Sequence, residues 1–122
     1  MAASTVLITG SSKGLGRSLA MAFARNQYNI ILHGRDRRDL TKVKESVLKY
    51  GVSCDVVRGD ITSEKTIDRL YDVARRRNID VLINNAGVYL YRPFQDMGAE
   101  DFRKVIEVNL IAPVLLMKKR RA

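Results

Sequence analysis

The stretch "TGSSKGLG", Thr9 to Gly16, decides the fold of this 122-residue chain. It follows a short apolar run, "TVLIT" from Thr5 to Thr9, and opens a segment from Leu15 to Asn26 in which apolar residues recur at helical spacing. The glycines therefore stand at the joint between a predicted strand and a predicted helix. At such a joint, glycine lets the chain turn sharply and lets the backbone approach an anion, which the free N–H groups of the helix then face.

Gly10, Gly14 and Gly16 give this loop the spacing G-x-x-x-G-x-G. Between a strand and a helix, this spacing predicts a cradle for the pyrophosphate of a dinucleotide, whereas a plain turn is the alternative that the position disfavours. It is not a P-loop, because Lys13 precedes Gly14 and no Gly-Lys-Ser/Thr follows. The serines add hydroxyl donors. The candidate cofactor contacts of the loop are Gly10, Ser11, Ser12, Lys13, Gly14, Leu15 and Gly16.

The rest of the chain alternates predicted strands and helices. Strands are expected at 28–33, 53–58 and 79–83, and helices at 36–50, from 63 to the arginines at 75–77, and from about 99, with Pro113 kinking or interrupting the last one. Strands that are separated by helices run parallel, with helices on both faces of the sheet. We therefore predict an α/β fold, a Rossmann-like doubly wound parallel sheet of about four strands, as a single domain over residues 1–122. Ligands of such sheets bind beyond the carboxyl ends of the strands.

Each predicted helix carries apolar residues that we expect on its buried face. They include Leu15, Leu19, Ala22 and Phe23 in the first helix and Phe102, Val105, Ile106, Leu110 and Leu115 in the last.

Charged residues follow the second and third strands. An NAD site usually places an acid after the second strand, but Gly34 and Arg35 stand there. A guanidinium suits a 2′-phosphate, and Lys13 can approach the same group, so we predict NADP in preference to NAD, with ordinary surface charge as the alternative. After the third strand, Asp60 can accept from an adenine amino group while Ile61 packs near the ring. An Asx turn at Asp60 is a compatible alternative.

The fourth strand ends at "NNAG", residues 84–87. A side-chain amide at Asn84 or Asn85 can tie adjacent strand ends together, and Ala86 and Gly87 leave space for a ribose. Farther along, the aromatic residues of the loop at 89–94 are expected in core or interface packing rather than beside a substrate.

Together these residues resemble the short-chain dehydrogenase/reductase family along the whole chain. The matching positions are Thr9-Gly10-x-x-x-Gly14-x-Gly16, Arg35, Asp60, Asn85-Ala86-Gly87 and "VNL" at Val108 to Leu110. The resemblance implies a sheet order of 3-2-1-4, an NADP(H) cofactor, and hydride transfer to or from an alcohol or carbonyl. It also implies that Asn109 matches the family's asparagine that helps to hold a water in the proton relay.

The family's catalytic serine and Tyr-x-x-x-Lys pair have no counterpart in these 122 residues, since no tyrosine is followed by lysine four positions later. In the family the tyrosine is the acid or base, and the lysine lowers its pKa. His33, the single histidine, is expected to be structural or solvated. We therefore expect the cofactor half of an oxidoreductase that binds NADP(H) with little or no turnover. The alternative is a non-catalytic nucleotide-binding module or subunit that needs a partner chain.

The formal net charge is +9, from 22 Lys and Arg against 13 Asp and Glu. Much of the excess lies at 75–77 and 118–121, near helix ends, where cations interact favourably with the last carbonyls. No aromatic residues interleave these clusters to stack on bases, so nucleic acid is not favoured as a partner.

The remaining features concern location and assembly. Cys54 has no second cysteine to pair with, no signal pattern opens the chain, and no apolar run approaches membrane-spanning length, so we predict a cytoplasmic location, no membrane partner and no metal site. The resemblance places the fourth strand at an open sheet edge. We therefore predict a homo-oligomer that covers this edge or the last helix.

Overall fold

The computed structural model describes residues 3–87, 96 and 98–120, so the aromatic residues at 89–94 lie outside the described residues. Strands and helices alternate as the sequence predicts. In chain order they are β1 (Thr5–Ile8), α1 (Gly14–Arg25), β2 (Asn29–Gly34), α2 (Arg37–Leu48), β3 (Cys54–Arg58), α3 (Glu64–Arg77), β4 (Val81–Ile83), α4 (Ala99–Ile106), the π-helix η2 (Glu107–Ile111) and α5 (Ala112–Arg120).

The four strands form one parallel sheet in the order β3-β2-β1-β4, which confirms the predicted fold class and strand order. Val6 of β1 lies opposite Ile30 of β2 and Val81 of β4. Among the described helices, none has the length and apolar character needed to cross a bilayer.

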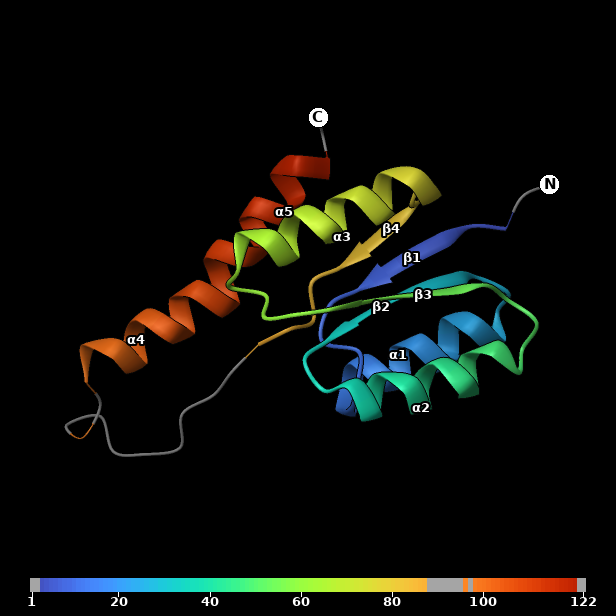
Figure 1. Cartoon of the computed structure of the whole chain (residues 1–122), viewed down its shortest axis with the longest axis horizontal. Helices are drawn as coiled ribbons and strands as arrows, with labels where there is room; N and C mark the ends of the chain where they lie inside the picture. The colour runs from blue at the N-terminus through green and yellow to red at the C-terminus, as the bar shows by residue number, and fades with distance from the viewer. Residues whose placement is uncertain (1–2, 88–95, 97, 121–122) are drawn as a thin grey trace.

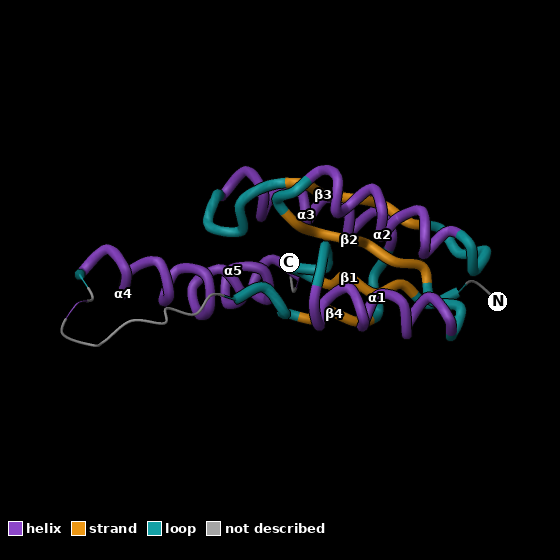
Figure 2. The backbone as a smooth tube through the Cα atoms, turned by 90° about the horizontal axis from the view of Figure 1, so that it is seen from below, coloured by secondary structure: helices purple, strands orange, loops and turns teal. Residues whose placement is uncertain are grey.

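The sheet is the middle layer of three, with α1 and α2 on one face and α3 and α5 on the other (Figure 1 and Figure 2). Alternate residues of β1 therefore enter different cores: Val6 and Ile8 pack with residues of α1 and α2, and Leu7 packs with residues of α3 and α5. The continuous apolar run of β1 follows from this double cover, since each of its four residues is buried.

The last helical segment differs from the predicted apolar face. Ile106 and Leu110 were expected inside, but they are 49% and 52% exposed, and Val108, Ala112 and Leu116 are buried instead. The cause is η2, in which the N–H of Ala112 donates to the carbonyl of Glu107, so the turn holds one residue more than an α-helical turn. The predicted interruption thus lies just before Pro113, which has no N–H to donate into the preceding turn.

The first helix also differs from prediction at one position. Leu15 is 68% exposed, and the buried residues of α1 are Gly16, Ala20 and Ala24. The first turn of α1 lies at the carboxyl edge of the sheet, beyond the strand residues that bury the rest of the helix. Leu19 and Phe23 are partly buried against the core, as expected.

Candidate cofactor-binding site

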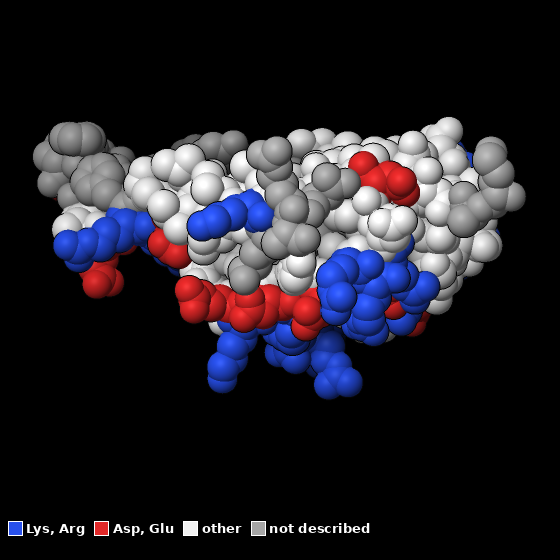
Figure 3. Space-filling view, turned by 90° about the horizontal axis from the view of Figure 1, so that it is seen from above, with Lys and Arg blue, Asp and Glu red and all other residues white. Residues whose placement is uncertain are grey.

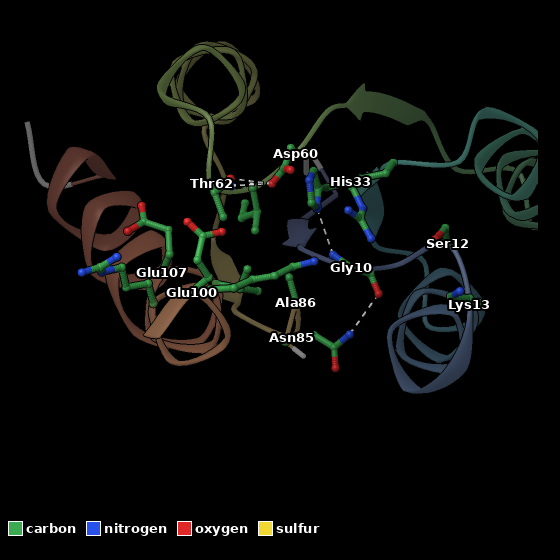
Figure 4. A pocket seen from close by; sticks show the side chains of 16 residues that line it. Gly10, Ser12, Lys13, His33, Asp60, Thr62, Asn85, Ala86, Glu100 and Glu107 are labelled. Atoms are coloured by element: carbon green, nitrogen blue, oxygen red, sulfur yellow. Dashed lines mark hydrogen bonds between the residues drawn. The ribbon is translucent and has the colours of Figure 1, made fainter. Parts of the chain in front are cut away.

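A cavity of about 700 Å³ opens at the carboxyl ends of the strands, where doubly wound sheets bind ligands (Figure 4). One wall comes from the loops that follow the four strands, and the other comes from α4 and η2. The lining residues are Gly10, Ser12, Lys13, His33, Arg35, Asp60, Ile61, Thr62, Asn85, Ala86 and Gly87 on the first wall and Glu100, Arg103, Lys104, Glu107 and Val108 on the second.

Gly10, the first residue of the glycine-rich loop after Thr9, is held through both of its backbone polar groups. Its N–H donates to Nδ1 of His33 at 3.0 Å, and its carbonyl accepts from Nδ2 of Asn85 at 3.0 Å, from the opposite side (Figure 4). Its φ of +63° lies in the left-handed region. A Cβ here would lie 2.9 Å from Cα of Ala86. Only glycine therefore satisfies the backbone angle and the space at this position.

The "NNAG" segment is attached to the end of β1 through the hydroxyl of Thr9, which is nearly fully buried. This oxygen accepts from the backbone N–H groups of Asn85 and Ala86, both at 3.0 Å, and the hydroxyl donates to the carbonyl of Ile83. The hydrogen bond from the Asn85 amide to the carbonyl of Gly10 confirms the expectation that an asparagine side chain ties adjacent strand ends together.

The start of α1 packs directly against this junction. A Cβ on Gly16 would meet the carbonyl oxygen of Gly10 and would lie 2.6 Å from Nδ2 of Asn85. Within the described residues, no side chain caps this helix at Lys13, and its first turn carries no acidic residue. The N–H groups of that turn therefore lack a competing protein anion, which suits a bound phosphate.

The two serines of the loop have different surroundings. Ser12 lines the cavity as predicted, but Ser11 is completely buried and does not. The Ser11 hydroxyl donates to the carbonyl of Ile8 at 2.9 Å and accepts from the N–H of His33 at 2.9 Å. The Ser11 hydroxyl, predicted to contact the cofactor, instead joins the ends of β1 and β2 and is unavailable to a ligand. Gly14, Leu15 and Gly16 are also absent from the cavity lining.

Lys13, just before α1, and Arg35, just after β2, bring positive charge to the cavity. Gly34, which stands where an acid would mark an NAD site, packs closely against Ser12. A Cβ on Gly34 would lie 3.0 Å from both Cβ and Oγ of Ser12, so the site has little room for a larger residue there.

Asp60 forms the predicted Asx turn at the end of β3. Its Oδ1 accepts from the N–H of Thr62 at 2.9 Å and from the Thr62 hydroxyl at 2.8 Å. These hydrogen bonds hold the pKa of Asp60 below its ordinary value, so the carboxylate is charged at neutral pH. Ile61, next to it, is buried and lines the cavity with Asp60.

The second wall was missed at the level of sequence. Glu100, Arg103, Lys104 and Glu107 recur at spacings of three and four, which places them on one helical face, and Glu100 and Glu107 lie across the cavity from Ser12 and Lys13 (Figure 4). Their spacing was the available signal, but a charged stripe usually faces solvent. Asn109 is not a lining residue, and its Oδ1 lies 3.2 Å from where a Cβ of Gly87 would be.

Residues 4–120 match the family model described as short chain dehydrogenase. The chain belongs to the short-chain dehydrogenase/reductase family of oxidoreductases. It is 34% identical over 113 residues to a glucose 1-dehydrogenase of Gluconobacter oxydans, covering 90% of this chain and 42% of that protein. It is 31% identical over 109 residues to a 3β-hydroxysteroid dehydrogenase 1 of Eggerthella lenta, covering 87% and 42%. The chain thus spans less than half the length of these curated relatives.

Two solved structures of dehydrogenases are also similar to this chain. A Thermococcus sibiricus alcohol dehydrogenase complexed with 5-hydroxy-NADP superimposes with a TM-score of 0.91 at 27% identity, covering 98% of this chain and 52% of that chain. A short-chain dehydrogenase from Sphingobium yanoikuyae in complex with NADPH has a TM-score of 0.88 at 31% identity, covering 96% and 47%.

Proposed function

We propose that this chain binds NADP(H) in the cavity at the strand ends, as the cofactor-binding part of a short-chain oxidoreductase. The observation that carries the proposal is the fixed backbone of Gly10 beside an uncapped helix start, with Lys13 and Arg35 on the same wall. A fixed loop and a helix N-terminus favour a pyrophosphate, and the two cations favour an additional phosphate. The NADP and NADPH complexes of related structures support the same choice of cofactor.

The lining residues suggest how the parts of the cofactor are distributed. The loop that begins at Gly10 would hold the pyrophosphate, and Arg35, Lys13 and Ser12 would hold the 2′-phosphate. On the other side, Asp60 and Ile61 would hold the adenine. Asn85, Ala86 and Gly87 would leave space for a ribose. The bound nicotinamide would supply or accept the hydride.

We further propose that the 122-residue polypeptide binds the cofactor with little or no turnover. Hydride transfer to a carbonyl needs a matched proton donor at the oxygen, and the family's Tyr-x-x-x-Lys spacing does not occur in this sequence. Of the family's catalytic residues, the asparagine has a match in this sequence, Asn109. A carbonyl or alcohol substrate would react only when residues outside these 122 supply the serine, tyrosine and lysine. The second candidate function is a nucleotide-binding subunit with a dedicated partner. It predicts no turnover even when the missing serine, tyrosine and lysine are supplied.

Calorimetric titration with NADP⁺ and NAD⁺ tests the proposed cofactor. We expect Arg35→Ala to raise the Kd for NADP⁺ about tenfold or more, the effect of losing a charge-assisted hydrogen bond, and to leave the Kd for NAD⁺ nearly unchanged. Arg38→Ala is the matched control, because Arg38 is also exposed and basic but does not line the cavity. Equal losses for both ligands, or no binding of either by the wild type, would contradict the proposal.

We also propose that a second copy of the chain covers α4, η2 and α5. Large apolar side chains are exposed along one side of these helices: Ile106, Leu110, Val114 and Met117. Among the described strands, β4 pairs only with β1. On the face seen in Figure 3, acidic side chains lie between groups of basic ones, which disfavours a polyanion as partner on that face. The exposed apolar residues favour self-association.

Sedimentation velocity tests this assembly at micromolar concentration. We expect Leu110→Glu to shift the protein toward monomer, and Leu48→Glu, a control on an exposed leucine of α2, to leave the oligomer intact. A monomeric wild type would contradict the proposal.

A further inference from the structure

The ring of His33 is buried between two loops of the cofactor cavity and bonds to the backbone of each. Nδ1 accepts from the N–H of Gly10 at 3.0 Å, and Nε2 lies 2.9 Å from the carbonyl oxygen of Gly59. An amide N–H can only donate and a carbonyl can only accept, so the neutral ring must carry its proton on Nε2. These partners therefore fix the tautomer of His33.

The backbone of His33 also bonds to the glycine-rich loop. Its N–H donates to the hydroxyl of Ser11 at 2.9 Å, and its carbonyl accepts from the N–H of Ser11 at 2.8 Å. Gly59 is fixed in turn, because its N–H donates to the carbonyl of Gly34 at 3.0 Å. The imidazole is thus the one described side chain that bonds both to the glycine-rich loop and to the loop after β3.

We propose that neutral His33 is a positioning residue that holds Gly10 and Gly59 in register, and that a proton taken up from solvent by Nδ1 breaks the bond to Gly10 and weakens NADP(H) binding. This role rests on the proposed function. After protonation, two N–H donors would face each other at a buried position, and the Gly10 peptide would lose one of its two restraints. Asn85 alone would then hold the loop that is proposed to cradle the pyrophosphate.

Charged groups around the ring act in both directions. Asp60, in the loop after β3, favours the protonated ring, whereas Arg69 of α3 and Arg35 after β2 disfavour it. Burial is the largest effect, and it lowers the pKa of His33 below the ordinary 6.5. A bound anionic cofactor would attract a protonated ring, but both ring nitrogens are bonded to backbone groups. Strengthened binding at acidic pH would therefore contradict the role that we assign.

The test compares the pH dependence of NAD⁺ and NADP⁺ binding in the wild type and in His33→Asn. Asn offers an acceptor oxygen at the position of Nδ1 but does not titrate. As the pH falls from 7.5 through the pKa of His33, located by ¹⁵N titration of its ring, we expect the Kd of the wild type to rise up to about fivefold more than that of the variant, the effect of one buried hydrogen bond. NAD⁺ removes the titration of the 2′-phosphate from the comparison, and circular dichroism at each pH verifies folding. Parallel pH profiles would overturn the proposal.

A second measurement needs no variant, because His33 is the only histidine in the chain. The ¹⁵N spectrum of the imidazole reports its tautomer and its titration directly. We expect the Nε2–H form with a pKa below 6.5, and a predominant Nδ1–H form would overturn the proposal. Failure of the wild type to bind either cofactor at pH 7.5 would overturn the proposed function, and the proposed effect on binding with it. Binding with equal pH profiles would overturn only the role of His33.

Discussion

The two walls of the cavity are built in different ways. On the strand-end wall, backbone groups are held in place by side chains, as in the bonds of buried His33 and half-buried Asn85 to Gly10. On the wall formed by α4 and η2, charged side chains such as Arg103 and Lys104 project from the surface of a helix. The shape of the strand-end wall therefore depends on glycines, which have no side chain. On the wall formed by α4 and η2, side chains can be substituted without a change in the backbone.

The largest expected effect comes from filling the space at Gly16. Gly16→Ala places a Cβ against the carbonyl of Gly10 and the amide of Asn85, and we expect it to lower the free energy of unfolding by about 3 kcal/mol. Urea denaturation measures the change. Gly98→Ala is the control, because a Cβ at Gly98 has no neighbour within 4 Å in the described structure, and we expect a change within about 0.5 kcal/mol. Similar losses in both variants would remove the contrast between the walls.

Next in size is the loss of the buried hydroxyl of Thr9. Thr9→Val keeps the shape but leaves the N–H of Ala86 without its acceptor and the N–H of Asn85 with only the carbonyl of Ile83, and we expect the free energy of unfolding to fall by about 2 kcal/mol. Thr41→Val removes an exposed hydroxyl that donates to the carbonyl of Arg37, so its expected effect is within about 0.5 kcal/mol. Thermal and urea unfolding of both variants should agree on this order.

A smaller effect concerns pH. Since burial lowers the pKa of His33 in the folded protein, the unfolded chain binds more protons below pH 6.5, and stability must fall as the pH falls from there through the lower pKa of the folded state. Above pH 6.5 the ring is neutral in both states, so its contribution is complete. His33→Gln should have a flatter dependence of melting temperature on pH between 7.5 and 5.5. An equally steep decline in the variant would assign the effect to other groups.

The smallest effect is expected on the wall formed by α4 and η2. Glu107→Gln removes a charge that lines the cavity but leaves the helix backbone unchanged. We expect a change in the free energy of unfolding within about 0.5 kcal/mol, measured beside Thr9→Val. A loss as large as that of Thr9→Val would show that this wall is also held by specific interactions.

The strand-end wall could be predicted from sequence because its residues follow strands, and the ends of parallel strands meet at one edge. Gly10, Asp60 and Asn85 were placed correctly for this reason. The separation of Ser11 from Ser12 was not predictable, because the buried position of Ser11 depends on its contact with His33 of a neighbouring strand.

The last helical segment shows a different limit. Its apolar face was assigned with one uniform helical spacing, but the wide turn at η2 changes that spacing between Ile106 and Ala112. The charged residues of α4 had the spacing of one face, yet nothing in them indicated that this face would border a cavity. Local sequence pattern specifies a helix more readily than it specifies what the helix packs against.

The π-helix η2 joins two helices, α4 and α5, that face different parts of the molecule. Residues of α4 line the cavity, and Ala112 and Leu116 of α5 pack into the core beside α3. Because Glu107–Ile111 holds one residue more than an α-helical turn, deleting one residue there would restore α-helical winding and leave α5 near its present orientation relative to α4. Winding all of the present residues as a regular α-helix would instead rotate α5 by about 100°, the angle of one residue. Leu115 would then take the place of Leu116 in the core, so this turn sets the rotational phase between a ligand-facing helix and a core helix.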